Sequence, residues 1–384
     1  MSATPTSTVP QVYGDDQEIV LGTHADPGPP ETAYGFVPSA VRAYFDYVNE
    51  ELGGVCGRRI SLVGESDNSD PAVATKNVRK LLDQDKVMAI IGGAGDATHS
   101  AVVDYLNEEG VPDLWIMSGL HKWAADQDEY PWSISLLPDY FVEGTIMGRY
   151  ISQELPGKRV GVLYQDDDFG KDGLAGIKNG LDPNSNEIAS IQSHEITAID
   201  VADQVAKLKE DGAEVVALYS WLGFTAQAIS HAHRLGWRPQ FVAGAINADP
   251  LVFQFVQPQL LEGTISLGAF KMVDSIDDPA IARHREIMHR ASGLTPGSIS
   301  IYGETIAALA VEVLSRACDN LTRDGFMDAV EELTEYQSDL LLDGVTITLS
   351  EADHLAIEQM RTLKATVVDG KGKWEYFGPI REFR

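Results

Sequence analysis

The sequence has few cysteines, few basic residues and no long apolar run. Only Cys56 and Cys318 occur in 384 residues, and neither belongs to a CxxC motif, so zinc and thioredoxin chemistry have no support. The pair is compatible with one structural disulfide in an oxidising compartment, and equally with two unrelated buried thiols. No apolar run approaches the ~20 residues that cross a bilayer, so we expect no direct insertion of the folded chain into a membrane.

Basic residues are outnumbered by acidic ones, with 29 Lys and Arg against 58 Asp and Glu, which gives a formal net charge of −29. Such a field repels phosphate backbones and anionic headgroups, so nucleic-acid binding and peripheral membrane binding are both disfavoured. The chain is longer than the ~100–200 residues of a typical domain, which predicts two domains by default and is also compatible with one large domain. Its hydrophobic content of 44% is enough for two buried cores.

Motifs of common catalytic and cofactor sites are also missing, including GxxxxGK[ST], HExxH and GxSxG. GGAGDATHS (92–100) superficially resembles a dinucleotide loop, but it lacks the third glycine spacing and follows the third strand. DDDFGKD (166–172) begins like a calcium loop, but position twelve is Ile177, which favours a solvated acidic loop. His231 and His233 lie two apart and face different sides of a helix. We therefore expect no enzyme activity, no cofactor and no metal.

Short β-branched runs alternate with segments of helical period from residue 18 onward, which predicts two doubly wound parallel sheets and hence two lobes. Strands are predicted at 19–24, 58–66, 87–93, 113–119, 158–164, 187–192, 214–220, 240–245 and 264–270. Helices are predicted at 37–52, 71–82, 99–110, 140–154, 201–211, 225–235, 278–292, 302–319 and 323–334, and after Gly170. Residues 363–379 predict a hairpin turning at Asp369-Gly370. The part of the chain after about 264 is expected to add strands and helices to both lobes.

Residues 1–17 are rich in Ser, Thr and Pro, and this composition predicts a disordered tether. A mature extracytoplasmic protein cut behind its signal would begin in this way, and so would a cytoplasmic protein with a ragged start.

Ligands of open parallel sheets bind beyond the carboxyl ends of the strands, often at helix N-termini. Each candidate residue there is, by itself, better explained by packing or capping. However, several such residues occur in loops of two different sheets, and this pattern is expected for a cleft between two lobes. The aromatic and small polar candidates are Tyr34, Asp96, Thr98, Ser118, His121, Phe169, Trp221, Asn247 and Tyr302.

Three stretches resemble the leucine/isoleucine/valine-binding branch of the type I periplasmic binding proteins. YQDDDFGKD (164–172) after one strand, with DPAVA (70–74) after an earlier one, is a fairly specific combination. The order and spacing of the stretches extend the resemblance from about residue 18 to 380. The stretches are GVCGRRISLVGESDNSDPAVATKNVRKLL (54–82), the run from YPWSISLLPDYFVEG (130–144) through KRVGVLYQDDDFGKDGLAGIKNGL (158–181), and LTRDGFMDAVEEL (321–333) with the terminal GKWEYFGP (372–379).

The resemblance implies two Rossmann-like lobes joined by a three-strand hinge, with a cleft that closes on a ligand. The N-terminal lobe is expected at 18–136 plus 266–338, and the C-terminal lobe at 137–265 plus 339–384. The helix predicted at 302–319 then lies in the same lobe as Cys56, and we expect a Cys56–Cys318 disulfide.

The function that the resemblance implies is that of a periplasmic or extracellular solute-binding component of an ABC transporter. It would pass a branched-chain amino acid, or a related small amide, carboxylic acid or aromatic acid, to a membrane permease. A lipid anchor on a removed N-terminal segment is compatible with this role. The alternatives are a ligand-sensing regulatory or receptor domain of the same fold and, with less support, a cofactor-binding enzyme.

The resemblance also implies roles for individual residues. In the amino-acid-binding members, the ligand carboxylate is held by a Ser or Thr in one loop and by backbone amides of a second loop. Aromatic residues form the walls of the site. An acidic residue pairs with the ligand ammonium. The first loop matches Asp96, Ala97 and Thr98, and the second matches Ser118, Gly119, Leu120 and His121. The wall matches Tyr34, Phe169, Trp221, Leu222 and Tyr302, and the acidic position lies near Ala245.

The chain departs from this pattern at two of these positions. Ala245 has no carboxylate, and Asp96 stands where the serine is expected. An Asp beside a ligand carboxylate would cost several kcal/mol at low effective dielectric. Either Asp96 turns away and Thr98 binds with backbone amides, or the ligand is not an ordinary α-amino acid. Asn247 offers a neutral polar contact instead.

Overall fold

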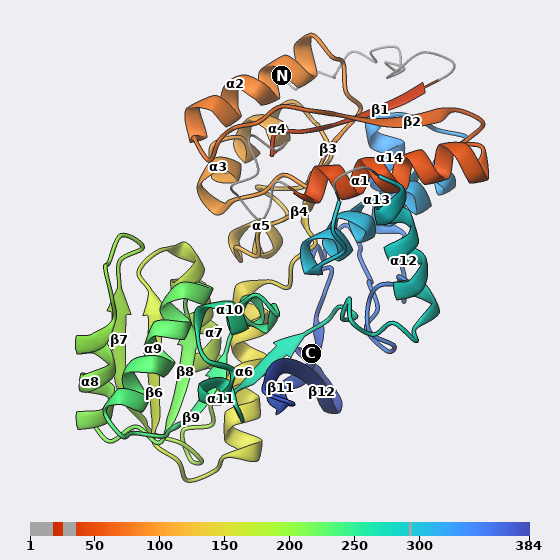
Figure 1. The fold of residues 1–384 in the computed structure, drawn as a ribbon. Helices are drawn as coiled ribbons and strands as arrows, with labels where there is room; N and C mark the ends of the chain where they lie inside the picture. The colour runs from red at the N-terminus through yellow and green to blue at the C-terminus, as the bar shows by residue number, and fades with distance from the viewer. Residues whose placement is uncertain (1–17, 26–35, 292–293) are drawn as a thin grey trace, which may run out of the picture.

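The structure, a computed structural model, describes residues 18–25, 36–291 and 294–384, which form two α/β lobes (Figure 1). Each lobe contains one sheet, and helices cover both sheets. The predicted fold class is therefore confirmed. The predicted tether at 1–17 and Tyr34 lie outside the described residues.

The sheet of the first lobe has five strands in the order β2-β1-β3-β4-β5, and all its pairings are parallel. The buried residues Ile19 and Leu21 of β1 lie beside Ile60 and Leu62 of β2. Sequence periodicity did not predict β5, because a three-residue strand is too short to show an alternation. The strands are β1 (Glu18–Thr23), β2 (Arg59–Gly64), β3 (Ile90–Ile91), β4 (Asp113–Ile116) and β5 (Ser133–Ser135).

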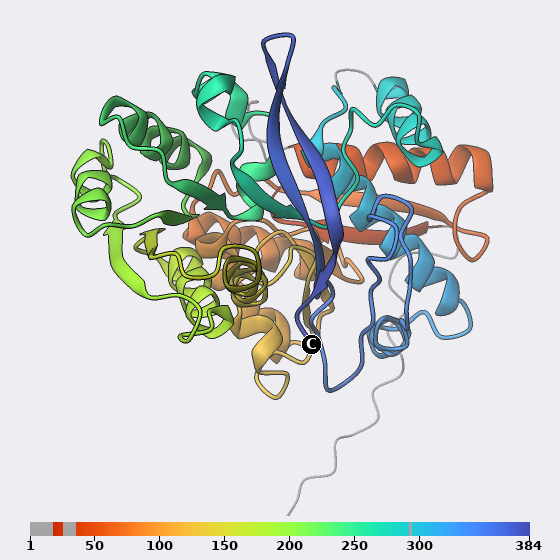
Figure 2. The same cartoon turned by 90° about the horizontal axis from the view of Figure 1, so that it is seen from below.

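The sheet of the second lobe has seven strands in the order β12-β11-β10-β9-β8-β6-β7. It is parallel except at one edge, where β11 runs antiparallel to both β10 and β12. The predicted turn Asp369-Gly370 joins β11 to β12 with positive φ at both residues, and the hairpin is the long blue ribbon of Figure 2. The strands are β6 (Val160–Gln165), β7 (Ile188–His194), β8 (Val215–Tyr219), β9 (Gln240–Ala243), β10 (Ile265–Gly268), β11 (Gln359–Val368) and β12 (Lys371–Glu382).

Most helices begin and end close to their predicted residues, but the helix predicted at 99–110 is two short helices, α3 and α4. The first lobe contains α1 (Phe36–Tyr47), the π-helical turn η2 (Val48–Leu52), α2 (Pro71–Asp83), α3 (Asp96–Ser100), α4 (Val103–Glu108), α5 (Lys122–Ala125), α12 (Pro279–Arg290), α13 (Ser298–Arg316) and α14 (Arg323–Glu331). The second lobe contains α6 (Tyr140–Glu154), α7 (Asp168–Gly180), α8 (Ala202–Glu210), α9 (Leu222–Arg234), the 3₁₀ turn η3 (Ala245–Ala248), α10 (Val252–Phe255) and α11 (Pro258–Leu261).

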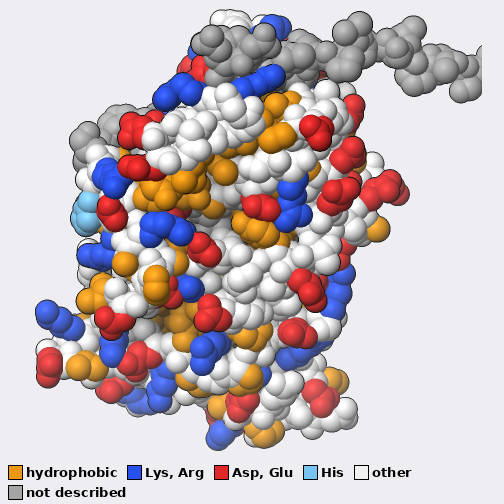
Figure 3. All heavy atoms as spheres, turned by 90° about the vertical axis from the view of Figure 1, so that its right-hand side faces the viewer, with side chains coloured by type: hydrophobic (Ala, Val, Ile, Leu, Met, Phe, Trp, Pro, Cys, Tyr) orange, Lys and Arg blue, Asp and Glu red, His pale blue; other side chains and the backbone are white. Residues whose placement is uncertain are grey.

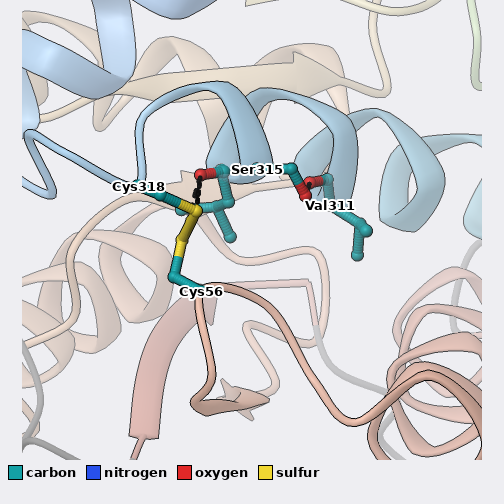
Figure 4. The surroundings of a disulfide bond; sticks show 5 residues. Cys56, Val311, Ser315 and Cys318 are labelled. Carbon is teal, nitrogen blue, oxygen red and sulfur yellow. Dashed lines mark hydrogen bonds between the residues drawn. A yellow bond between two sulfur atoms is a disulfide. The ribbon is translucent and has the colours of Figure 1, made fainter.

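Helix α13 is the central helix of the first lobe. It packs closely on α1, since a Cβ at Gly303 would lie 2.6 Å from the Val37 carbonyl oxygen. By length and composition α13 is apolar enough to cross a membrane, but most of it is buried in the core of the lobe. A disulfide joins Cys318, just beyond its end, to Cys56 on the loop before β2 (Figure 4). Two segments 262 residues apart in the chain are thereby held together.

The contacts of residues 269–357 bear on where the chain returns to the first lobe. Leu340, Val345 and Ile357 are buried in the same core cluster as α13, and Leu342 N donates to the Ala269 carbonyl. In contrast, β10 pairs only with strands of the second sheet. This part of the chain adds its described strands to the second sheet alone. We propose 269–357, in place of 266–338, as the second segment of the first lobe.

The acidic loop 166–172 serves as a helix cap in the structure. Asp167 accepts a hydrogen bond from Gly170 N at 3.0 Å at the start of α7, and Asp166 pairs with Lys171 at 2.9 Å. The acidic side chains of this strand-to-helix loop are exposed or half-buried, as the sequence favours, whereas Phe169 within it is buried. On the face shown in Figure 3, acidic and basic side chains are interspersed, so the net negative charge is not gathered into one patch there.

Candidate functional site

A cavity of about 430 Å³ lies between the two lobes. The first lobe contributes the start of α13 and the segment after β10, and the second lobe contributes the start of α9, the turn η3 and part of α6. Most of the lining side chains are apolar or aromatic. Five of the predicted site residues line this cavity: Phe169, Trp221, Leu222, Ala245 and Tyr302.

Aromatic rings wall the cavity from both lobes. On the second lobe, the Phe169 ring packs against Tyr140 and Tyr219, with ring centroids 4.8 Å apart in each pair. On the first lobe, Tyr302 packs edge to face against Phe270 at 4.7 Å. These contacts fix the rings before any ligand arrives, and such rigid apolar walls favour a molecule with an apolar body.

One acidic side chain on the cavity lining was missed by sequence reasoning. Glu143 lies in the first turn of α6, is 4% exposed, and its Oε1 accepts a hydrogen bond from Ala245 N at 2.7 Å. Ala245, the position where the expected carboxylate is absent, therefore lies next to a carboxylate that α6 supplies. The available signal is a single charged residue within the otherwise uncharged run Val142–Met147, whose other residues are all buried.

Burial raises the pKa of Glu143 to about 7. Hydrogen bonds from the Ala245 amide and the Tyr219 hydroxyl lower this pKa and only partly offset the effect of burial. The Tyr219 hydroxyl also lies within reach of the Tyr140 carbonyl, 3.2 Å away. Glu143 therefore changes its charge near neutral pH.

The predicted polar loops of the first lobe lie outside the lining of this cavity. The Ser118 hydroxyl donates to Asp96, and the Thr98 hydroxyl donates to the Ala94 carbonyl at 2.7 Å. Burial raises the pKa of Asp96 to about 6; the Ser118 hydrogen bond opposes this rise, and the acidic residue Asp167 of the second lobe adds to it. The hydroxyls expected to hold a ligand carboxylate are thus already used inside the first lobe.

The second of these loops contacts the other lobe directly. His121 N donates to Asp172 on α7 at 2.9 Å, and His121 Nδ1 lies 2.7 Å from Asp139, which caps α6. Hydrogen bonding to Asp139 raises the pKa of His121. We call Asp96, Ser118, His121, Asp139 and Asp172 the polar seam, because these residues lie where the polar loops of one lobe meet the other.

Four further predicted residues are placed away from the cavity lining. Leu120 and Asn247 are buried, and the Asn247 amide donates to the Ser220 carbonyl at 3.1 Å within the second lobe. The Gly119 carbonyl accepts from Tyr140 N at 2.7 Å, and Ala97 is exposed. Within the described ranges, no group of three or more His, Cys, Asp and Glu side chains is arranged to hold a metal ion.

Comparisons with known proteins agree with this architecture. An amino acid binding protein of Pseudomonas aeruginosa is 23% identical over 65% of this chain and 66% of its own, so the match spans just under two thirds of that relative. The substrate-binding protein of a fatty acid ABC transporter from Thermomonospora curvata has a TM-score of 0.78 at 21% identity, covering 96% of this chain and 94% of that one.

A branched-chain amino acid ABC transporter protein from Thermus thermophilus, solved with bound valine, has a TM-score of 0.79 at 19% identity, over 94% of this chain and 97% of that one. These structural likenesses show the two-lobed type I fold. The profile of the family described as periplasmic binding protein matches residues 28–373, which is most of the chain. The chain belongs to the periplasmic binding protein family.

Proposed function

We propose that this protein is the extracytoplasmic solute-binding component of an ABC transporter, and that it carries its ligand in the cavity between the lobes. The observation that carries the proposal is the cavity itself, lined from both lobes by fixed aromatic side chains. Its volume of about 430 Å³ lies within the ~300–1,000 Å³ of small-molecule sites. The ligand would be delivered to a membrane permease, and no catalytic step is involved.

The ligand class we propose is a branched-chain amino acid or a related small amide, carboxylic acid or aromatic acid. Relatives named for amino acids and for fatty acids support a ligand that combines an apolar body with a polar end. The aromatic walls suit the apolar body, and Glu143 provides a polar contact on the lining. The Cys56–Cys318 disulfide supports a location in an oxidising compartment. A lipid anchor on a removed N-terminal segment belongs to the same proposal.

A thermal-shift screen tests this function. Protein stripped of ligand by mild unfolding and refolding would be screened against amino acids, amines, short amides, and aliphatic and aromatic acids. A ligand that binds only the folded protein should stabilise it by about 2.7 kcal/mol at a hundredfold excess over Kd. A melting-temperature rise with one chemical class supports the proposal. No response from any compound contradicts it.

A further inference from the structure

We propose that Glu143 is the specificity-determining residue of the cavity and that it selects a ligand carrying a protonated amine. The inference rests on the proposed function and deepens it, because it names the polar group that the ligand must present. It also relocates the acidic contact from the position of Ala245 to a side chain of another element.

The backbone holds Glu143 firmly in place. Asp139 caps α6 through the amides of Phe141 and Val142, so the first turn of the helix is fixed. Close packing against α7 then sets the position of α6, since a Cβ at Gly144 would lie 2.4 Å from the Gly173 carbonyl oxygen. A side chain fixed in this way is preorganised to contact a ligand.

The surroundings of Glu143 provide hydrogen-bond donors but no counter-charge. Within the described ranges, Glu143 forms no ion pair, and the charged neighbour that acts on it is another acid, Asp139. Lys271 is the basic residue of the described lining, and it is already paired with Asp278 at 2.8 Å. Asp249, a second acid, also lines the cavity and accepts a hydrogen bond from Leu251 N.

A buried carboxylate without a counter-charge is costly, and a ligand ammonium removes this cost by forming a charge-assisted hydrogen bond. A ligand carboxylate would instead face two acids, Glu143 and Asp249, across an apolar cavity where charges interact strongly. The apolar body of the ligand then lies against Trp221 and Tyr302. The favoured ligand is therefore an amine with a small apolar body, with or without a second polar group.

Four compounds with the same carbon skeleton separate the possible polar groups: pentylamine, norvaline, pentanamide and pentanoate. Isothermal calorimetry at pH 8 should show the amine-bearing compounds binding at least about tenfold more tightly than pentanoate. In Glu143→Gln this preference should fall about ten- to a hundredfold, while the Gln oxygen still accepts the Ala245 hydrogen bond. Glu154→Gln, on the last turn of the same helix and half exposed, is the matched control and should bind as wild type.

Amine affinity should also fall about tenfold from pH 8 to pH 6, since protonation of Glu143 removes the counter-charge. Asp96, His121 and Asp172 also have raised pKa values, so each could contribute to the pH dependence of amine affinity. If Glu143 is the group responsible, Glu143→Gln should flatten this pH dependence. Any other ligand found in the library screen would be tested against Glu143→Gln in the same way.

Three results would overturn the inference and leave the proposed function standing. They are tighter binding of pentanoate than of the amines, an unchanged amine preference in Glu143→Gln, and a library ligand that has no amine. A library in which nothing binds contradicts the proposed function itself, and the inference fails with it.

Discussion

The polar seam and the cavity lie between the same two lobes, but they differ in how their polar groups are used. In the seam, the predicted ligand-holding groups already have partners, as in the Ser118–Asp96 and His121–Asp172 hydrogen bonds. In the cavity, fixed aromatic walls surround a buried acid, Glu143, that has no counter-charge among the described residues. We infer from this contrast that the seam joins the lobes and that a ligand gains more free energy by binding in the cavity.

The strongest effect should appear in the pH dependence of the stability of the ligand-free protein. Glu143 and Asp96 both have folded pKa values, about 7 and about 6, above their ordinary values of 4.5 and 3.8. The folded state therefore binds more protons than the unfolded state, and stability falls as pH rises through these values. For Glu143 the loss between pH 4.5 and pH 7 should be about 3 kcal/mol.

Denaturant unfolding at pH 5, 6, 7 and 8 separates the two regions. Glu143→Gln should remove the Glu143 contribution between about pH 4.5 and pH 7, which includes most of the decline above pH 6. Asp96→Asn should reduce the decline only below about pH 6, where Glu143 continues to contribute. His121, whose pKa is also raised, contributes in the same direction in both variants. Identical slopes for wild type and Glu143→Gln would contradict the assignment of a buried, titrating acid to the cavity.

Truncating the aromatic wall should have the next largest effect. Trp221→Ala and Tyr302→Ala should each weaken ligand binding about ten- to a hundredfold, since each ring supplies a large apolar contact area. The fold should remain intact, as Trp221 is 37% exposed at the start of α9. Calorimetry with the screened ligand checks this, with the exposed Phe255→Ala as control. If both variants bind as wild type, the placement of the ligand in the cavity is wrong.

A smaller effect is expected from the polar seam. Asp172→Ala removes the acceptor of the His121 backbone hydrogen bond between the lobes. One lost hydrogen bond should weaken ligand binding about fivefold by favouring the open state, with no change in ligand preference. Calorimetry and small-angle scattering of the ligand-free protein measure the two effects, with Lys171→Ala as the neighbouring control. A loss as large as that of Trp221→Ala would mean that the seam itself holds the ligand.

The sequence predicts the two sheets because β-branched runs and helical periods alternate regularly along most of the chain. The boundary that we propose for the return to the second lobe differs from the predicted one, because residues 339–357 contain isolated bridges, such as Ser350–Asp353, and no regular strand. Which lobe such a segment packs on depends on tertiary contacts that no local period reveals.

The candidate site was predicted only in part for a similar reason. Trp221 and Tyr302 stand out as aromatic residues beyond predicted strands or at a helix start, and both line the cavity. Glu143 resembles any acid in the first turn of a helix. Only its contact with Ala245, 102 residues away, distinguishes it from a solvated residue. The sequence alone cannot decide whether Asp96 faces the ligand, and in the structure its carboxylate accepts a hydrogen bond from Ser118.

A crystal structure of the protein with the ligand identified in the screen would show directly where the ligand binds. We predict ligand density in the cavity, with its apolar body between Trp221 and Tyr302 and its polar end at Glu143. Density at Asp96, Ser118 and Thr98, with the cavity empty of ligand, would contradict the claim.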